Sequence, residues 1–394
     1  MRLRKIILAS ITASALTACG GGGGGSSQAP APIDNNDTPD NEPTVALNDL
    51  TVSLGDQKGA FVQGSIPYSQ GSSSAVVTSA PDMVKTNTSS KERIDLVYAV
   101  DSSIEEIYFS MSEEEGHISF SKEQMASAVA TSTAQTEAVS LIVEIPESAD
   151  NSDFCTTISV KTANQMLSDL TEVCFSVDEQ NASNRVVYFA DHSANSNLST
   201  LNFDTGEVVD IGATGYALTD IAFFGDELYG VTFTQLISID LETGEGAVVG
   251  NIGINNVNGL EGGEDLLYAG TTNGEFLSID PQTGEGTVID FFGSGATSSG
   301  DLVLSEDNDF LYGSLEIPGS ATDAIAKIDR ITGATEIMGN TGFDEVWGLA
   351  LFRSQLLGLT TDGELIIIDR TTGNGTLIEN TDSFNAGGAA AVKN

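Results

Sequence analysis

The stretch ISIDLETGEGAVVG at residues 237–250 returns as LSIDPQTGEGTVID at residues 277–290, forty residues further along the chain. An apolar residue, Asp and a following Thr-Gly recur five times, at Phe203–Gly206, Ile239–Gly244, Ile279–Gly284, Ile328–Gly333 and Ile368–Gly373. An aspartate in a tight turn accepts backbone N–H groups, and glycine adopts a positive φ without steric cost. We therefore interpret the repeated Asp as turn chemistry needed once per structural unit, rather than as a metal or substrate ligand.

Each turn belongs to a longer repeating unit. A Leu-Tyr-Gly triplet or a variant of it precedes the turn, at Val187–Phe189, Leu228–Gly230, Leu267–Ala269, Leu311–Gly313 and Leu356–Gly358. In four units another short apolar segment, such as DIAFFG at 220–225, comes before the triplet. Four short strands per forty residues predict one blade of a β-propeller, in which adjacent sheets bury each other's faces. The pattern resembles the blades of bacterial secreted propellers.

The first unit begins at Asn184 and lacks its innermost strand, and the segment Phe384–Val392 at the chain end supplies a matching one. The sequence therefore predicts a five-bladed propeller over residues 184–394, closed by the C-terminal strand. A sixth blade would have to come from residues 93–103, which lack the Thr-Gly turn. The six-bladed alternative is accordingly less favoured.

Residues 45–178 contain short alternating segments separated by polar turns, which predict a β-sandwich. The strand rhythm resembles that of bacterial immunoglobulin-like modules, without the Cys-Trp-Cys pattern of antibody domains. Residues Glu123–Glu137 are expected to form a helix or a long loop. The segment from Asp101 to Glu105 resembles the metal-adhesion motif of von Willebrand-type domains but departs from it at Glu105, so no metal site is expected. The predicted fold class is therefore all-β.

The N-terminus carries a targeting signal. Arg2, Arg4 and Lys5 precede the apolar run Ile6–Leu16, which is too short to span a bilayer as a helix. The following Leu16–Cys19 resembles the lipobox of bacterial lipoproteins. This resemblance implies a signal peptide at 1–18 and a lipid on Cys19, the alternative being a plain signal peptide with an accidental Cys.

The residues after the lipobox imply where the anchor resides. Gly20 replaces the Asp that favours inner-membrane retention in lipoproteins, which implies the outer membrane. Residues 19–44 are rich in Gly, Ser, Pro, Asp and Asn and predict a disordered tether of about 25–30 Å root-mean-square length. The side of the membrane is left open.

Two cysteines remain after Cys19. Cys155 and Cys174 form an even pair in an exported and therefore oxidising setting, which predicts a disulfide. A metal or redox role is disfavoured because the spacing is wide and the chain has only two histidines, His117 and His192.

The composition limits the partners. The formal net charge is -42, from 15 basic and 57 acidic residues, so the surface repels phosphates and anionic membrane surfaces. We expect no nucleic-acid binding, and contact with the membrane through the lipid anchor only.

Ligands of propellers usually bind where the inner strands begin and in the loops between the second and third strands of each blade. The inner-strand candidates are Asp220, Asn258, Asp301, Trp347 and Asn385. The loop candidates are His192, Asn195, Gln235, Asn273, Asp323 and Asp362. Trp347, the only Trp, is expected either to stack on a sugar ring or to pack between blades.

No Ser-His-Asp arrangement, H-E-x-x-H motif or phosphate-binding loop is visible, which favours a binding or scaffold module for an envelope protein or glycan. No catalytic residue, cofactor or metal is predicted. One alternative is a glycoside hydrolase that uses Asp220 and Asp301 as its carboxylate pair. Another is a calcium-dependent hydrolase propeller with oxygen ligands converging on the central channel.

Overall fold

The structure is a computed structural model. It describes residue 47 and residues 50–54, 57–69, 75–88, 90–111, 116–125, 129–131, 136–149, 152–178, 186–202, 207–380 and 386–391. The predicted signal peptide, Cys19, the tether, the first turn motif at 203–206 and Asn385 lie outside these residues. The described chain is almost entirely β-structure, as the sequence predicts. None of its described helices has the length and apolar character that crossing a membrane would require.

The N-terminal module consists of two sheets. The first runs β2 (Gln57–Lys58), β1 (Thr51–Leu54), β10 (Thr136–Glu144), β6 (Lys91–Val100) and β4 (Ala75–Ser79), with β9 (Val129–Thr131) also paired to β10. The second runs β3 (Ala60–Val62), β8 (His117–Ser121), β7 (Ile104–Ser110), β11 (Ser152–Thr162), β12 (Thr171–Val177) and β5 (Met83–Thr86). Alternate residues of both sheets, such as Leu141 and Phe109, share one buried core.

The expected helix or long loop at Glu123–Glu137 is only partly found. The helix α2 covers Lys122–Met125, but β9 occupies Val129–Thr131 and β10 begins at Thr136, so the expectation is wrong at these strands. Residues 126–128 and 132–135 lie outside the described residues. Antiparallel pairing of β9 with β10 satisfies backbone groups that a helix would have satisfied locally. A one-turn 3-10 helix, η2 (Glu147–Ala149), connects β10 to β11. The sequence also gave no sign of β5, which pairs in parallel with β12 at one edge of the described sheet.

The predicted disulfide is confirmed. Cys155 on β11 lies opposite Cys174 on β12, and their sulfur atoms are 2.00 Å apart. Direct cross-strand pairing brings the two Cβ atoms close enough for the bond.

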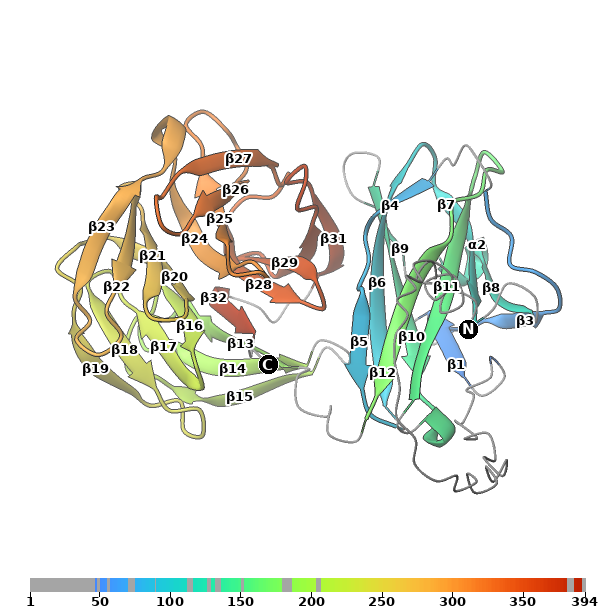
Figure 1. The fold of residues 1–394 in the computed structure, drawn as a ribbon, viewed down its shortest axis with the longest axis horizontal. Coiled ribbons are helices and arrows are strands. Elements are labelled where there is room, and N and C mark those ends of the chain that lie inside the picture. Colours follow the sequence, from blue (N-terminus) through green and yellow to red (C-terminus); the bar gives the residue numbers. More distant parts are fainter. Residues whose placement is uncertain are drawn as a thin grey trace, which may run out of the picture. The chain divides into compact units, whose positions relative to one another are not determined.

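The C-terminal part is a β-propeller (Figure 1), and its described residues form five four-stranded antiparallel sheets, numbered along the chain. Sheet 1 contains β32 (Ala386–Ala391), β13 (Val186–Asp191), β14 (Asn197–Asn202) and β15 (Val208–Ala213). Sheet 2 contains β16 (Asp220–Phe224), β17 (Glu227–Val231), β18 (Gln235–Ile239) and β19 (Gly246–Asn251). Sheet 3 contains β20 (Val257–Gly262), β21 (Leu267–Thr271), β22 (Glu275–Ile279) and β23 (Gly286–Phe291).

Sheet 4 follows η4 (Gly293–Gly295) and contains β24 (Thr297–Leu304), β25 (Phe310–Glu316), β26 (Ala324–Asp329) and β27 (Thr335–Asn340). Sheet 5 contains β28 (Val346–Phe352), β29 (Gln355–Thr360), β30 (Glu364–Ile368) and β31 (Gly375–Asn380). The inner strands contact one another in the order β16, β20, β24, β28 and β32, and β32 returns to β16. The C-terminal strand β32 pairs with β13, as the sequence predicts. Both ends of the propeller sequence therefore share sheet 1.

The repeated Asp is a turn residue, as interpreted from the sequence. The Asp240 Oδ1 atom accepts the backbone N–H groups of Glu242 and Thr243, both at 2.9 Å. Gly244 has a φ of +78°, and a Cβ there would lie 2.5 Å from the carbonyl oxygen of Gly212 on the preceding sheet. The other described turns repeat these hydrogen bonds at Asp280, Asp329 and Asp369. The motif thus closes a turn and lets adjacent sheets approach each other closely.

Charged residues connect sheet 5 to strand β6. The Arg353 guanidinium donates to the Glu92 carboxylate and to the Arg93 carbonyl, each at 2.7 Å. Arg93 in turn donates to Glu379 at 2.7 Å. Val97 of β6 packs in an apolar cluster with propeller residues of sheets 1 and 5. These contacts bury part of β6, while its residues Ile94, Leu96 and Tyr98 are buried in the core of the N-terminal module.

Candidate functional site

Two of the predicted ligand residues, Asp220 and Asp301, lie on inner strands of sheets 2 and 4 and are completely buried. The Asp220 carboxylate accepts the N–H of Ile221 at 2.8 Å and that of Leu260 on sheet 3 at 2.6 Å. The Asp301 carboxylate likewise accepts the N–H of Leu302 at 2.6 Å and that of Leu349 on sheet 5 at 2.5 Å. Each side chain therefore joins its own strand to the next sheet.

The two carboxyl groups also interact with each other. Burial raises the pKa of Asp220 well above its usual range, and the negative charge of Asp301 adds to the effect. Burial likewise raises the pKa of Asp301, which is hydrogen-bonded to Asp220. A hydrogen bond between two carboxyl groups needs a proton, so the raised pKa values favour a form of the pair that shares one. Asp220 and Asp301 are thus a buried pair of interacting carboxyl groups.

Asn258 also forms hydrogen bonds between buried parts of neighbouring sheets. Its side-chain amide donates to the carbonyl oxygens of Ser298 and Ser299 on sheet 4, at 3.0 Å each. The residue is only 7% exposed. Asn258 therefore holds sheet 3 against sheet 4.

Two other predicted residues meet at the surface. The rings of His192 and Trp347 lie edge to face with centroids 4.8 Å apart. His192, in the β13–β14 loop, is exposed, and Trp347, near the start of β28, is half-buried. The Trp347 backbone packs closely against Gly300, where a Cβ would lie 2.5 Å from the Trp347 Cα. Trp347 thus combines contact with the neighbouring sheet and contact with an exposed histidine.

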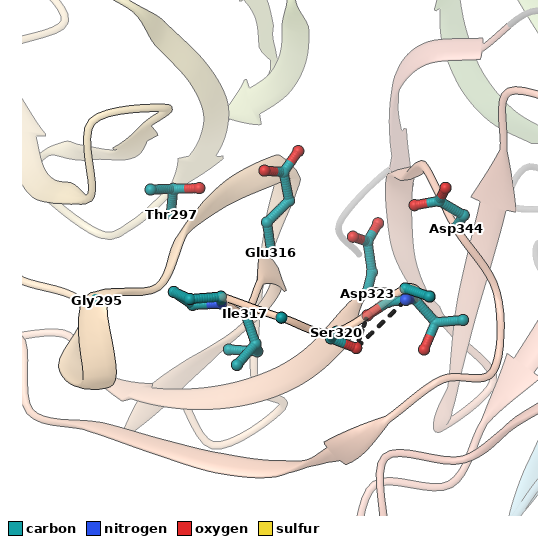
Figure 2. A pocket seen from close by; sticks show the side chains of 11 residues that line it. Gly295, Thr297, Glu316, Ile317, Ser320, Asp323 and Asp344 are labelled. Atoms are coloured by element: carbon teal, nitrogen blue, oxygen red, sulfur yellow. Dashed lines mark hydrogen bonds between the residues drawn. The ribbon is translucent and has the colours of Figure 1, made fainter.

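A cavity of about 470 Å³ opens beside sheet 4 (Figure 2). Its wall is the end of β25 at Glu316 and the β25–β26 loop that follows, with Thr297 at the start of β24 and Asp344 from the loop before β28. These are the two kinds of loop in which the sequence places a ligand site. Asp323 was among the loop candidates, but Glu316 and Asp344 were not. The available signal was length, because this loop spans 317–323 whereas the equivalent loop of sheet 2 spans 232–234.

Asp323 is the buried acidic group of this cavity, with only 2% of its surface exposed. Its Oδ2 atom accepts the Ser299 hydroxyl at 2.6 Å and the Val346 N–H at 2.8 Å. Burial raises the pKa of Asp323 to about 6, with a further contribution from the charges of Asp344 and Glu316, while the two hydrogen bonds oppose the shift. The cavity therefore holds a carboxyl group whose ionised form is disfavoured by burial, in spite of its two hydrogen bonds.

The remaining loop candidates are bound to their neighbours or lie apart from this cavity. The Gln235 amide donates to Asn251 at 3.4 Å, and the Asn273 carbonyl oxygen accepts from Asn256 at 3.3 Å. Within the described part of the chain, the only cluster with metal-ligand spacing is Cys155, Glu172 and Cys174, and its two cysteines form the disulfide.

The sequence matches no protein-family model and no curated protein. Among solved structures, a protein of unknown function from Bacteroides thetaiotaomicron is 12% identical, with 79% of this chain and 87% of that chain covered and a TM-score of 0.35. An auxiliary nutrient binding protein from the same organism is 11% identical, with 79% and 86% covered and a TM-score of 0.31. BamB from Moraxella catarrhalis is 17% identical, with 48% and 56% covered and a TM-score of 0.28.

Proposed function

We propose that this protein is a binding module of the bacterial cell envelope, held in the outer membrane by a lipid on Cys19. In this proposal residues 184–394 form one five-bladed propeller, and residues 45–178 form an immunoglobulin-like sandwich that carries it. The five four-stranded sheets and the closed order of their inner strands support the first assignment. The lipobox Leu16–Cys19 and Gly20 support the envelope location.

One observation carries the binding function. The cavity beside sheet 4 and the ring of His192 are open to solvent, whereas the carboxyl groups of Asp220 and Asp301 are completely buried. A glycoside hydrolase needs two carboxyl groups that touch the substrate on either side of the scissile bond. Asp220 and Asp301 instead use their oxygens to join adjacent sheets. This arrangement favours binding over hydrolysis.

The site offers two kinds of contact to an envelope protein or glycan. Trp347 and His192 provide an aromatic surface that is suited to apolar or sugar-ring contact. The cavity beside sheet 4 provides carboxylates and hydroxyl groups.

Thermal unfolding of the chain from residue 45 onward, against a panel of peptides, glycans, calcium and lactones, tests this function. The N-terminal module is retained because Arg353 forms an ion pair with Glu92 of β6. A bound ligand at about a hundred times its dissociation constant adds about 2.7 kcal/mol of stability. We expect a shift that Trp347→Ala weakens and that Ile331→Ala, at an exposed turn residue, leaves unchanged. Turnover of a glycoside or lactone that is lost in Asp220→Asn would contradict the proposal.

The anchor is tested separately. Expression of the full chain in a bacterial host with radiolabelled palmitate should label the wild type and not Cys19→Ala. A wild-type chain released unlabelled into the soluble fraction would refute the anchor and leave the binding function untouched.

A further inference from the structure

The cavity beside sheet 4 holds three carboxylates and no basic side chain among its lining residues. Figure 2 shows Glu316, Asp323 and Asp344 around the same space, with Glu316 and Asp344 exposed and Asp323 at the buried end. The negative charges of Glu316 and Asp344 act on Asp323. The chain therefore supplies negative charge to the cavity and no lining cation to balance it.

Asp323 gives the cavity a specific acceptor. Its Oδ2 atom accepts hydrogen bonds from Ser299 and Val346. The side chain is 2% exposed and lines the cavity, yet its Oδ1 atom is not among the buried oxygens that lack a partner. The Oδ1 atom is therefore open to the cavity, where a carboxylate oxygen can accept a hydrogen bond from a ligand.

The loop holds this acceptor in place. The Asp323 N–H donates to the Phe343 carbonyl at 2.9 Å, and the Asp323 carbonyl accepts the Thr341 N–H at 2.8 Å. The Ser320 hydroxyl donates to the Thr322 carbonyl at 2.7 Å. A ligand would therefore meet a largely preformed site, which reduces the ordering cost of binding.

The spacing of the carboxylates distinguishes between kinds of cation. Among the described residues, the carboxylate oxygens of Glu316, Asp323 and Asp344 do not all lie within 4.8 Å of one another. A calcium ion holds its oxygens at about 2.3–2.6 Å and needs a tighter set. A guanidinium or ammonium group presents several N–H donors and can reach separated carboxylates. Ile317 and Pro318 offer an apolar wall for the methylene stem behind such a group.

We propose that the cavity binds an organic cation, a guanidinium or primary ammonium group, with Asp323 as its buried partner and Glu316 and Asp344 at the rim. This proposal rests on the proposed binding function and names the chemistry of its ligand. The cation comes either from a free small amine or from a basic side chain of an envelope protein.

Trp347 is a built-in reporter for the test. It directly follows Val346, whose N–H binds Asp323, and it is the only Trp in the chain. We would titrate the chain from residue 45 onward with agmatine, with the amidated tripeptide Gly-Arg-Gly, with calcium, and with butanol as an uncharged control, following Trp347 fluorescence. We expect agmatine and the peptide to bind, and added salt to weaken both.

Substitutions of the three carboxylates test whether the cation binds in this cavity. Asp323→Asn should weaken agmatine binding by about tenfold or more, because it removes a charge-assisted hydrogen bond. Glu316→Gln and Asp344→Asn should each weaken it by about two- to fivefold, as partly solvated charges do. If Asp323→Asn does not fold, the double variant Glu316→Gln/Asp344→Asn replaces it, with both positions exposed. Glu242→Gln, at an exposed turn of sheet 2, is the matched control and should change nothing.

Tighter binding of the peptide than of agmatine would indicate a protein partner, and equal binding a small amine. The proposal is overturned if neither cation binds at millimolar concentration, if calcium alone binds, or if the rim and Asp323 variants bind like the wild type. A Trp347-dependent shift with a glycan in the earlier panel would then leave the binding module standing without this ligand.

Discussion

Replacing Asp220 with Asn tests whether the two buried carboxyl groups of the inner strands share a proton. In the wild type burial raises the pKa of both groups, and the negative charge of Asp301 raises the pKa of Asp220 further. The folded state therefore binds more protons than the unfolded chain, whose aspartates have a pKa of about 3.9. Stability from this pair is fully present below that value and is lost as the pH rises toward the raised pKa.

The magnitude follows from proton linkage. Each proton held only by the folded state lowers the free energy of unfolding by about 1.4 kcal/mol per pH unit. In Asp220→Asn the side-chain amide can donate a hydrogen bond to Asp301 without binding a proton from solution. The dependence of the free energy of unfolding on pH should therefore become weaker by about 1.4 kcal/mol per pH unit. In the wild type the two Asp220 oxygens accept the backbone N–H groups of Ile221 and Leu260. In Asp220→Asn an NH₂ group replaces one of these oxygens, so one backbone N–H group loses its acceptor. We expect a cost of about 1–3 kcal/mol at low pH that shrinks as the pH rises.

The assay is urea unfolding of the chain from residue 45 onward, followed by Trp347 fluorescence between about pH 5 and 8. Asp323, with a pKa of about 6, also titrates in this range, so the comparison is repeated with Asp323→Asn in both proteins. Equal slopes with and without Asp220→Asn in both backgrounds would refute the shared proton.

Two further predictions concern stability. Arg353→Ala should lower the free energy of unfolding by about 3–5 kcal/mol, because Glu92 is fully buried, whereas Arg370→Ala, at an exposed pair, should cost less than about 1 kcal/mol. Similar losses in chemical unfolding would contradict a structural role for the Arg353 pair. Gly244→Ala should cost more than Gly215→Ala in thermal unfolding, because both have positive φ but only Gly244 lies against another backbone. Equal costs would show that φ strain alone matters there.

Asp220 shows where sequence reasoning about the site stops. The sequence correctly places Asp220 at the start of an inner strand. It does not show that the side chain is completely buried, because burial depends on how sheets 2 to 5 pack together. Trp347 and His192 were both named as candidates, yet nothing local shows that residues so distant in sequence lie 4.8 Å apart. Glu316 and Asp344 were missed because surplus acidic residues make any one carboxylate uninformative without its neighbours.

By itself the sequence determined the four-stranded repeat, the closing C-terminal strand and the Cys155–Cys174 bond. These features depend on short-range turn chemistry, strand period and the pairing of adjacent strands, which a chain encodes locally. Only the tertiary structure decided that Asp220 and Asp301 are buried together and that Asp323 lines an open cavity. The state of a carboxyl group depends on burial and on the charges and donors around it, and segments far apart in the chain supply those.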